Sequence, residues 1–254
     1  MKILLTILDG LGDTPIPELG DKTPLEAAHI PNMDKLAEEG MCGLVEPYLF
    51  PGEKGPTSEG AHVALFGYKD YFLGRGPYEA AGAGVEMKEG DIAFRVNFGT
   101  VNDNLEIVDR RAGRINETKP FSETISGKEI DGVEFLLKSS FGHRGVLVMR
   151  SEKGLSAKVS DGDPHEVGAK VNKINALDES EEAEFTANVL NKFLEWAHDI
   201  LENHSLNKER KEKELLPANY LLIRGPGKMS EIPSFKEKYG LDAAFIAGGT
   251  LYKG

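Results

Sequence analysis

The order of apolar and polar residues in the first part of the chain predicts an α/β arrangement. Residues 3–8 form a continuous run of largely branched apolar side chains, which is typical of a central strand covered on both faces. Residues 25–39 have helical spacing on both sides of Pro31, a residue well tolerated as the first of a new helix, and Gly40 follows as a stop signal. Residues 44–49 are a candidate second strand.

From about Gly74 the pattern changes to short strands and one long helix. Two β-like runs on either side of the turn Asn102-Asp103-Asn104 predict a hairpin. Residues 181–203 place apolar side chains along one face and predict an amphipathic helix, and the charged stretch 207–214 is either an exit linker or a solvated helix end. We interpret this block as a separate α+β unit. Its expected strands are residues 92–98, 105–108, 133–138 and 144–150.

Near the C-terminal end the α/β pattern returns. Residues 220–224 and 243–247 resemble buried strands, joined through Gly225-Pro226-Gly227 and a helix at residues 234–239. We therefore divide the chain into residues 1–74, the first part of a core domain, residues 75–214, the α+β unit, and residues 215–254, a return to the core.

A glycine-rich loop leads into a helix-compatible stretch that begins at Ser58. A helix N-terminus has unpaired N–H groups and a partial positive charge, so it can bind a phosphate and stabilise a serine alkoxide. His62 follows four residues later, on the same helix face. The alternative is that Thr57 or Ser58 only caps the helix and His62 packs beside it.

Asp9 follows directly after the first predicted strand. Open α/β sheets bind ligands at the carboxyl ends of their strands, so a carboxylate there is a candidate metal ligand. The alternative is a simple Asp-Gly turn with Gly10.

Composition excludes several classes of partner. The chain has 254 residues, a formal net charge of −12 and a single cysteine, Cys42. This charge disfavours general attraction to nucleic acid or to an anionic membrane, and one cysteine excludes an intramolecular disulfide. The N-terminal apolar run is too short for a signal peptide, and no stretch approaches the roughly 20 apolar residues of a membrane span, so we expect a cytoplasmic protein.

With this net charge, an anionic ligand needs a local group of arginines. Arg110, Arg111 and Arg114 stand in one short segment, and their planar forks suit phosphate and carboxylate groups. The alternative is that they are solvated side chains near a hairpin. Arg144 and Arg224 are weaker candidates.

Asp161, Asp163 and His165 have the chemistry of metal ligands and close spacing. Asx turns beside a proline use the same residue types, and we favour that interpretation.

Several motifs taken together resemble the archaeal type of cofactor-independent phosphoglycerate mutase, over essentially the whole chain. The most specific are Ile-Leu-Asp-Gly-Leu-Gly-Asp at residues 7–13, Lys-Thr-Pro-Leu-Glu-Ala-Ala at 22–28 and Ser-Glu-Gly-Ala-His-Val-Ala-Leu-Phe-Gly-Tyr at 58–68. Further matches are Gly-Arg-Gly-Pro-Tyr-Glu-Ala at 74–80, Val-Asp-Arg-Arg-Ala-Gly-Arg-Ile at 108–115, His-Arg-Gly-Val-Leu-Val at 143–148, Asp-Pro-His-Glu-Val-Gly at 163–168 and Pro-Ser-Phe-Lys-Glu-Lys-Tyr-Gly at 233–240.

The resemblance implies an alkaline phosphatase-like α/β core with a mainly parallel sheet, interrupted by the α+β unit as an inserted domain. It implies that 3-phosphoglycerate and 2-phosphoglycerate interconvert through a phosphoserine at Ser58. Two divalent metal ions, Mn, Mg, Co or Zn, would serve as cofactors without an organic one, and Asp9 and Ser58 would bind one of them. Substrate would be bound by His62, Arg110, Arg111, Arg114, Arg144 and Arg224.

Two features set this chain apart from the family pattern. Glu59 and Gly60 replace the Asp and Thr of a Ser-Asp-Thr-Ala-His motif, which affects substrate positioning more than the nucleophile. The later motifs Asp-x-x-Gly-His and Gly-Asp-His, which bear the other metal ligands, do not occur in this sequence.

We therefore expect a chain cut short at its C-terminal end. It would bind metal weakly, lack mutase activity and form a homo-oligomer or aggregate through an uncovered sheet edge. The alternatives are a related phosphatase or phosphomutase, or an inactive chain that only binds a phosphorylated ligand.

Overall fold

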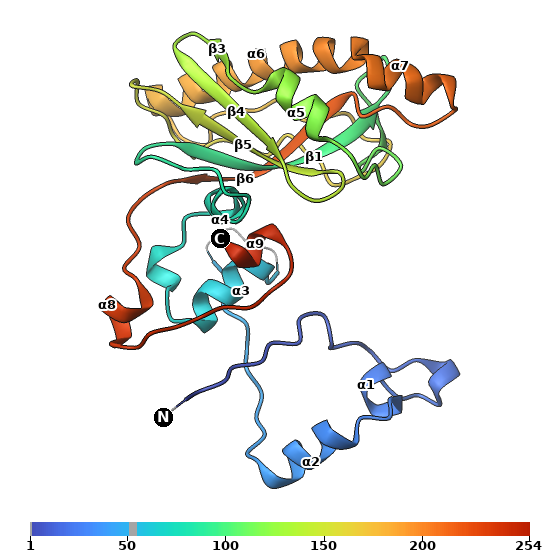
Figure 1. Ribbon diagram of the computed structural model, residues 1–254, viewed down its shortest axis with the longest axis vertical. Coiled ribbons are helices and arrows are strands. Elements are labelled where there is room, and N and C mark those ends of the chain that lie inside the picture. The colour runs from blue at the N-terminus through green and yellow to red at the C-terminus, as the bar shows by residue number, and fades with distance from the viewer. Residues whose placement is uncertain (1, 51–54) are drawn as a thin grey trace. The chain divides into compact units, whose positions relative to one another are not determined.

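The computed structural model describes residues 2–50 and 55–254 and separates into two compact units, Met1–Pro47 and Tyr48–Gly254. Each unit is described by itself. Figure 1 labels their helices and strands in chain order.

The N-terminal unit consists of short helices and extended chain. They are the 3-10 helix η1 (Pro17–Leu19), α1 (Pro24–Ala27) and α2 (Pro31–Glu39). The Thr23 hydroxyl accepts a hydrogen bond from the Glu26 amide at 3.2 Å, while the Glu26 carboxylate accepts one from the Thr23 amide at 2.8 Å, so a capping box begins α1. Pro31 begins α2 and Gly40 ends it, which confirms the predicted helices on both sides of Pro31.

The prediction of strands at residues 3–8 and 44–49 is wrong. Residues 3–8 and 44–49 form no strand, and Leu4 and Leu44 are 90% and 103% exposed. An apolar strand is stable only when neighbouring strands pair with it and other elements cover its faces. The helices of this unit are short and contain no buried residue, so they supply neither.

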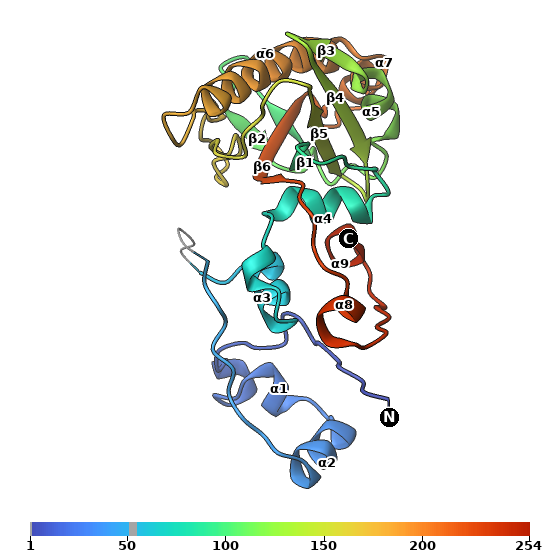
Figure 2. The same ribbon diagram turned by 90° about the vertical axis from the view of Figure 1, so that its left-hand side faces the viewer.

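The second unit is built on an antiparallel sheet in the order β2-β1-β5-β4-β3, with β6 also pairing with β1 (Figure 2). The predicted strands of the α+β unit and the β1–β2 hairpin are confirmed. No parallel pair occurs among the strands of the described residues, so the predicted parallel core sheet is not seen there. The strands are β1 (Ile92–Val101), β2 (Ile107–Asp109), β3 (Lys128–Ile130), β4 (Val133–Ser139), β5 (Arg144–Arg150) and β6 (Tyr220–Lys228).

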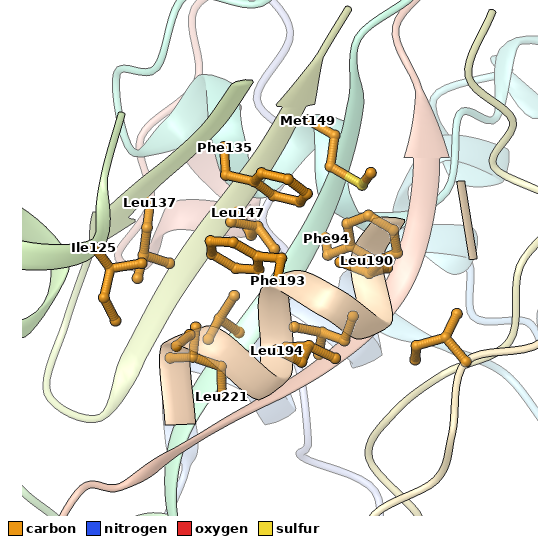
Figure 3. Packing of buried hydrophobic residues seen from close by; sticks show 14 of the residues in the cluster. Phe94, Ile125, Phe135, Leu137, Leu147, Met149, Leu190, Phe193, Leu194 and Leu221 are labelled. Atoms are coloured by element: carbon orange, nitrogen blue, oxygen red, sulfur yellow. The ribbon is translucent and has the colours of Figure 1, made fainter. Parts of the chain in front are cut away.

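One face of the sheet is covered by the long helix α6 (Glu181–Asn203), whose bounds match the prediction (Figure 1). The rings of Phe135 on β4 and Phe193 on α6 stack with centroids 4.0 Å apart and planes 3° apart. Figure 3 shows Phe193 among the side chains of β1, β4 and β5. The α6 face of the sheet is therefore the main hydrophobic core, and α5 (Lys119–Ile125) packs at its edge.

Of the two interpretations of residues 207–214, the helix end is confirmed and the linker is wrong. The stretch lies largely in α7 (Ser205–Glu212). The completely buried Asn207 donates hydrogen bonds to the carbonyls of Leu201 and Ala218 and accepts one from the Ala218 amide at 2.8 Å. These bonds tie α7 into the unit.

The chain then continues into β6, which confirms the predicted strand at residues 220–224. The sequence predicts Gly225-Pro226-Gly227 as part of the connection to the next strand, but β6 includes these residues and runs on to Lys228, paired with β1. The domain division at residues 74 and 214 stays a prediction, and residues 220–228 belong to the sheet of the middle segment.

The other face of the sheet is partly covered by α4 (Arg75–Gly82), as Figure 2 shows. Here α4 packs so closely that a Cβ at Gly76 would lie 1.9 Å from the Ala93 carbonyl oxygen.

The helix predicted at residues 234–239 is confirmed as α8 (Phe235–Tyr239). The strand predicted at residues 243–247 is wrong, because these residues form no strand and Ile246 is 99% exposed. The remaining elements are α3 (Ser58–Leu65), η2 (Lys69–Tyr71), α8 (Phe235–Tyr239) and α9 (Thr250–Lys253).

Candidate functional site

Helix α3 begins at Ser58, as the sequence predicts, but the capping residue is Thr57. The Thr57 hydroxyl accepts a hydrogen bond from the Gly60 amide at 3.2 Å. A Cβ at Gly60 would lie 3.0 Å from both the Phe50 ring and the Thr57 hydroxyl, so glycine allows this tight first turn. Ser58 is half-buried and is not needed as the cap.

His62 is bonded to the same first turn. Its Nδ1 lies 2.7 Å from the Ser58 carbonyl oxygen, which can only accept, so Nδ1 bears the proton. This tautomer leaves Nε2 as the acceptor of the ring. The His62 ring packs beside Tyr252 with centroids 4.9 Å apart.

A chain of ion pairs runs from α3 through α4 to the sheet. The Glu59 carboxylate pairs with Arg75 at 2.9 Å, and Arg75 binds Glu79 at 2.9 Å. Glu79, only 4% exposed, also pairs with Arg95 of β1 at 3.5 Å and accepts a hydrogen bond from the Thr250 hydroxyl. The first turn of α3 is thus joined to a buried arginine of the sheet.

Polar side chains gather on the α4 face of the sheet, beyond the part that α4 covers. Arg95 stands opposite Arg224 of β6, and Asn97 stands opposite Arg144 of β5. Strand residues two apart share a face, so all four side chains belong to this one. We call Arg95, Asn97, Arg144 and Arg224 the arginine face.

Three polar atoms of the arginine face are buried without a hydrogen-bond partner in the part of the chain that the structure describes. They are the Nε of Arg95, the Oδ1 of Asn97 and the Nε of Arg224. Buried polar atoms are nearly always paired, and each unpaired one costs about 1–3 kcal/mol. These atoms therefore mark a place where a ligand or water would complete the structure.

The electrostatics of the arginine face favour an anion. Burial, followed by repulsion from Arg75 and Arg224, lowers the pKa of Arg95 to about 9, although Glu79 partly opposes the shift. Burial and the same kind of repulsion also lower the pKa of Arg224. An anion placed between these guanidinium groups would offset both the repulsion and the lost hydration.

The positive charge of the arginine face also affects the pKa of His143. Burial, followed by repulsion from Arg144, Arg111 and Arg95, lowers the pKa of His143 to about 4. Arg111 therefore lies near enough to His143 to act on the same imidazole as Arg95 and Arg144 of the arginine face.

The Arg110 guanidinium is bound to other side chains of the protein. Its guanidinium donates two hydrogen bonds to the Asp163 carboxylate, at 2.6 and 3.1 Å, and one to His165 Nδ1 at 3.1 Å. Arg224 also donates to His165 Nδ1, at 3.3 Å. Asp163 accepts a further bond from the His165 amide, the Asx turn that we favoured, and Asp161 accepts one from the Gly225 amide.

Asp163→Asn should destabilise the protein by about 1–3 kcal/mol at neutral pH, because it removes the charge that Arg110 pairs with. Burial opposes ionisation of Asp163, but bonds from Arg110 and the His165 amide outweigh it and place its pKa below the ordinary value. The stabilisation is therefore complete above about pH 4 and is lost as the pH falls further.

Urea unfolding between pH 7 and pH 2 checks this expectation. The gap between wild type and Asp163→Asn should close at the acid end. Asp103→Asn, a change at an exposed hairpin position, should show no such gap, and a gap constant with pH would contradict the assignment to Asp163.

Arg111 and Arg114 lie in a tight turn after β2. The Asp109 carboxylate accepts hydrogen bonds from the amides of Arg111 at 2.6 Å and Gly113 at 3.1 Å. Ala112, Gly113 and Arg114 all have positive φ values, so the turn is sharply bent. Both arginines are exposed, and neither forms an ion pair with the described residues.

All the arginine candidates belong to the second unit, where Arg110 and Arg224 both donate to His165 Nδ1. Asp9 belongs to the N-terminal unit, in a turn with Gly10. Among the described residues, no group of three or more His, Cys, Asp or Glu side chains could bind a metal ion. Asp161, Asp163 and His165 form no such group either. The donors described here do not fit a complete two-metal site.

Sequence reasoning missed Arg75, Glu79, Arg95 and Asn97. A signal was present for two of them, because Arg95 and Asn97 occupy alternate positions in the otherwise apolar stretch Ile-Ala-Phe-Arg-Val-Asn-Phe. A polar pair at period two inside a buried strand marks one face of the sheet as polar.

The fold and site define an α/β protein with a serine at a helix N-terminus and a group of arginines, Arg95 buried among them, on one sheet face. The family model of 2,3-bisphosphoglycerate-independent phosphoglycerate mutase matches residues 37–207. The chain belongs to the 2,3-bisphosphoglycerate-independent phosphoglycerate mutase family, which confirms the resemblance seen in the sequence and its α/β fold class.

Its archaeal relatives are similar over the whole chain. The 2,3-bisphosphoglycerate-independent phosphoglycerate mutase 1 of Methanocaldococcus jannaschii is 51% identical over 257 residues, covering 100% of this chain and 61% of the relative. The corresponding mutase of Methanococcus aeolicus is 48% identical and is covered to 62%. The chain therefore spans about three fifths of the length of these relatives.

Solved structures agree with this relationship. The cofactor-independent phosphoglycerate mutase from Thermoplasma acidophilum has a TM-score of 0.63 and 40% identity, with 97% of this chain and 65% of that one covered. The PH0037 protein from Pyrococcus horikoshii has a TM-score of 0.69 and 33% identity, with 97% and 57% covered. No helix of the described residues is long and apolar enough to cross a membrane.

Proposed function

We propose that this chain bears the phosphoryl-accepting serine and the substrate-binding face of a phosphoglycerate mutase. The enzyme would interconvert 3-phosphoglycerate and 2-phosphoglycerate, a glycolytic isomerisation. The observation that supports it most is the continuous series of ion pairs from Glu59, beside Ser58, to Arg95 on the arginine face. These ion pairs connect the first turn of α3, which contains Ser58, to the buried Arg95 through the partly buried Arg75.

In the proposed reaction the Ser58 Oγ attacks the phosphorus, the bond from phosphorus to the glycerate oxygen breaks, and that oxygen takes up the proton that Ser58 gives up. The neighbouring hydroxyl of glycerate then attacks the phosphorus of the phosphoserine, the bond from phosphorus to Oγ breaks, and Oγ takes up the proton that this hydroxyl gives up. The backbone amides and the positive end of α3 would stabilise the negative charge on the transferred group. Covalent transfer through serine divides one difficult displacement into two.

The metal requirement is part of the proposal. Divalent metal ions, with Asp9 and Ser58 among their ligands, would lower the pKa of the serine hydroxyl. Asp9 and Ser58 alone do not complete such a site, and the described residues supply no group of three ligands. We therefore propose that the 254-residue chain by itself binds phosphoglycerate without turning it over.

The test uses both the 254-residue chain and a fusion of this chain to the segment of the 51% identical archaeal relative that it does not cover. Phosphorus NMR with 3-phosphoglycerate and Mn²⁺ should show 2-phosphoglycerate for the latter and no turnover for the former. Release of inorganic phosphate would identify a phosphatase instead. Tight binding of two metal ions by the 254-residue chain, together with turnover, would refute its inactivity.

Arg111→Lys should weaken binding of 3-phosphoglycerate by about threefold to tenfold while keeping the charge, because an ammonium cannot reproduce a bidentate fork. Calorimetric titration of the 254-residue chain measures the effect. We expect Arg114→Lys to behave similarly, whereas Arg110→Lys would also break the ion pair with Asp163 and is no test of substrate binding alone. Unchanged affinity in the Arg111 and Arg114 variants would place the anion site elsewhere.

A further inference from the structure

Helix α3 is held at its C-terminal end as well as at its first turn. Gly67 has a φ of 76°, and its amide donates to the Ala64 carbonyl at 2.9 Å. The Tyr68 amide donates to the Val63 carbonyl at 2.8 Å. These bonds form a Schellman motif, in which a left-handed glycine ends a helix. The Phe66 carbonyl lies beyond the hydrogen bonds of the helix and needs another donor.

That donor comes from α8, which lies beside α3 (Figure 2) and follows β6 in the chain. The Tyr239 hydroxyl donates a hydrogen bond to the Phe66 carbonyl at 2.8 Å. A Cβ at Gly67 would lie 2.1 Å from this hydroxyl, so a larger residue there would displace Tyr239. Phe245, beyond α8, packs its edge against the Phe66 ring with centroids 6.0 Å apart.

A cation strengthens the contact between α8 and the segment that follows α3. The Nζ of Lys238 lies 4.9 Å from the ring centroid of Tyr68, 5.0 Å from that of Tyr71 and 5.7 Å from that of Tyr239. An ammonium within about 6 Å of an aromatic face is attracted to the ring, and here one ammonium contacts three rings. We call Tyr68, Tyr71, Lys238 and Tyr239 the tyrosine cage.

Helix α8 keeps its shape although it has only five residues. The Ser234 hydroxyl accepts a hydrogen bond from the Glu237 amide at 3.2 Å, and the Glu237 carboxylate accepts one from the Ser234 amide at 2.7 Å. This capping box fixes the start of α8, and Gly240 ends it with a φ of 67°. Lys238 and Tyr239 are therefore presented together by a helix with defined ends.

The end of α3 matters for the reaction because the two ends of a short helix move together. At a rise of about 1.5 Å per residue, the eight residues of α3 place Ser58 roughly 10 Å from the last turn. A shift of about 1 Å at that turn therefore moves the Ser58 oxygen by a similar distance. Misplacing a reacting group by about 1 Å can slow a reaction by about 100-fold.

We propose that Lys238 and Tyr239 are positioning residues for the phosphoryl transfer. From α8 they fix the C-terminal end of α3 and thereby set the place of the Ser58 oxygen at its start. This inference rests on the proposed function, since it takes Ser58 as the nucleophile. Loss of the tyrosine cage should slow transfer to Ser58 without weakening the binding of phosphoglycerate, because neither side chain belongs to the arginine face.

Hydrogen exchange tests the contact in the 254-residue chain. Tyr239→Phe keeps the ring and deletes only the hydroxyl, whereas Lys238→Met keeps the length of the side chain and deletes its charge. Each should speed amide exchange in peptides from residues 58–71 about threefold or more, while peptides from α6 keep their wild-type rates. Lys236→Met is the matched control and should change neither, because Lys236 is exposed on the same helix and its ion pair with Asp242 lies in solvent.

The kinetic test uses the fusion of this chain to the uncovered segment of the archaeal relative. Single-turnover measurements with ³²P-labelled 3-phosphoglycerate separate the rate of phosphoserine formation from the affinity for the substrate. Tyr239→Phe and Lys238→Met should each lower the rate about tenfold and leave the affinity unchanged within about twofold. Lys238→Arg keeps a cation over the rings and should restore the rate to within about threefold of wild type.

The outcomes separate this inference from the function on which it rests. Unchanged exchange at residues 58–71 in both variants refutes the contact. Faster exchange with an unchanged rate, or equal losses of rate and affinity, overturns the positioning role and leaves the proposed function standing. If the wild-type fusion forms no phosphoserine although both variants speed exchange, the proposed function fails, the positioning role fails with it, and α8 is only a structural support.

Discussion

Ser58→Ala should abolish the labelled phosphoserine and the interconversion of phosphoglycerates in the fusion of this chain to the uncovered segment of the archaeal relative. The substitution removes the atom that forms the covalent bond to phosphorus, and no other hydroxyl occupies the first position of α3. Stability should fall by no more than about 1 kcal/mol, because the cap is made by Thr57. Acid quenching after incubation with ³²P-labelled 3-phosphoglycerate, followed by peptide mapping, measures the label.

Thr57→Ala is the matched control for that experiment. It deletes the neighbouring hydroxyl and the cap, so it should cost about 1 kcal/mol of stability while the phosphoserine still forms. Mutase activity retained in Ser58→Ala would refute the nucleophile. A label lost equally in both variants would mean that the intact helix start, and not the Ser58 oxygen, is what the reaction requires.

Phe193→Ala should lower the free energy of unfolding by about 3–5 kcal/mol. Its ring is completely buried and stacks on Phe135, between α6 and the sheet (Figure 3), so truncation leaves a cavity that rigid neighbours cannot fill. Chemical denaturation of the 254-residue chain, followed by tryptophan fluorescence or circular dichroism, gives the value.

Phe141→Ala provides the comparison, because Phe141 is 80% exposed at the turn between β4 and β5. It should change stability by less than about 0.5 kcal/mol. Similar losses in the two variants would mean that the α6 face of the sheet is not the main hydrophobic core.

The regular middle of the chain could be predicted because its signal is local. Helix α6 repeats apolar residues every three or four positions over its whole length, and β5 is bounded by turn signals on one side and arginines at both ends. Where the hydrophobic period and the length of a segment indicate the same element, the prediction depends little on the rest of the protein.

The strands predicted at residues 3–8, 44–49 and 243–247 failed for the opposite reason. An apolar run indicates that a segment prefers to be buried, but it does not indicate which element will cover it. The structure exposes Leu4, Leu44 and Ile246 almost completely, because no strand of the described residues pairs with these segments.

The helix start at Ser58 could be predicted from the sequence, but the contacts of the candidate site could not. The glycine-rich loop indicated a helix start at Ser58, and the three arginines at residues 110–114 indicated anion chemistry. That Arg110 is committed to Asp163, 53 positions away in sequence, follows only from the folded chain. The buried Arg95 and Asn97 became apparent only when strand register placed Arg224 and Arg144 beside them.

The pairing of β1 with β6 has a consequence for biosynthesis. Arg95 emerges from the ribosome long before Arg224, which stands opposite it in the finished sheet. Contacts between segments so distant in sequence form late, since a long loop must close before they contribute. The arginine face is therefore completed only after β6 docks against β1.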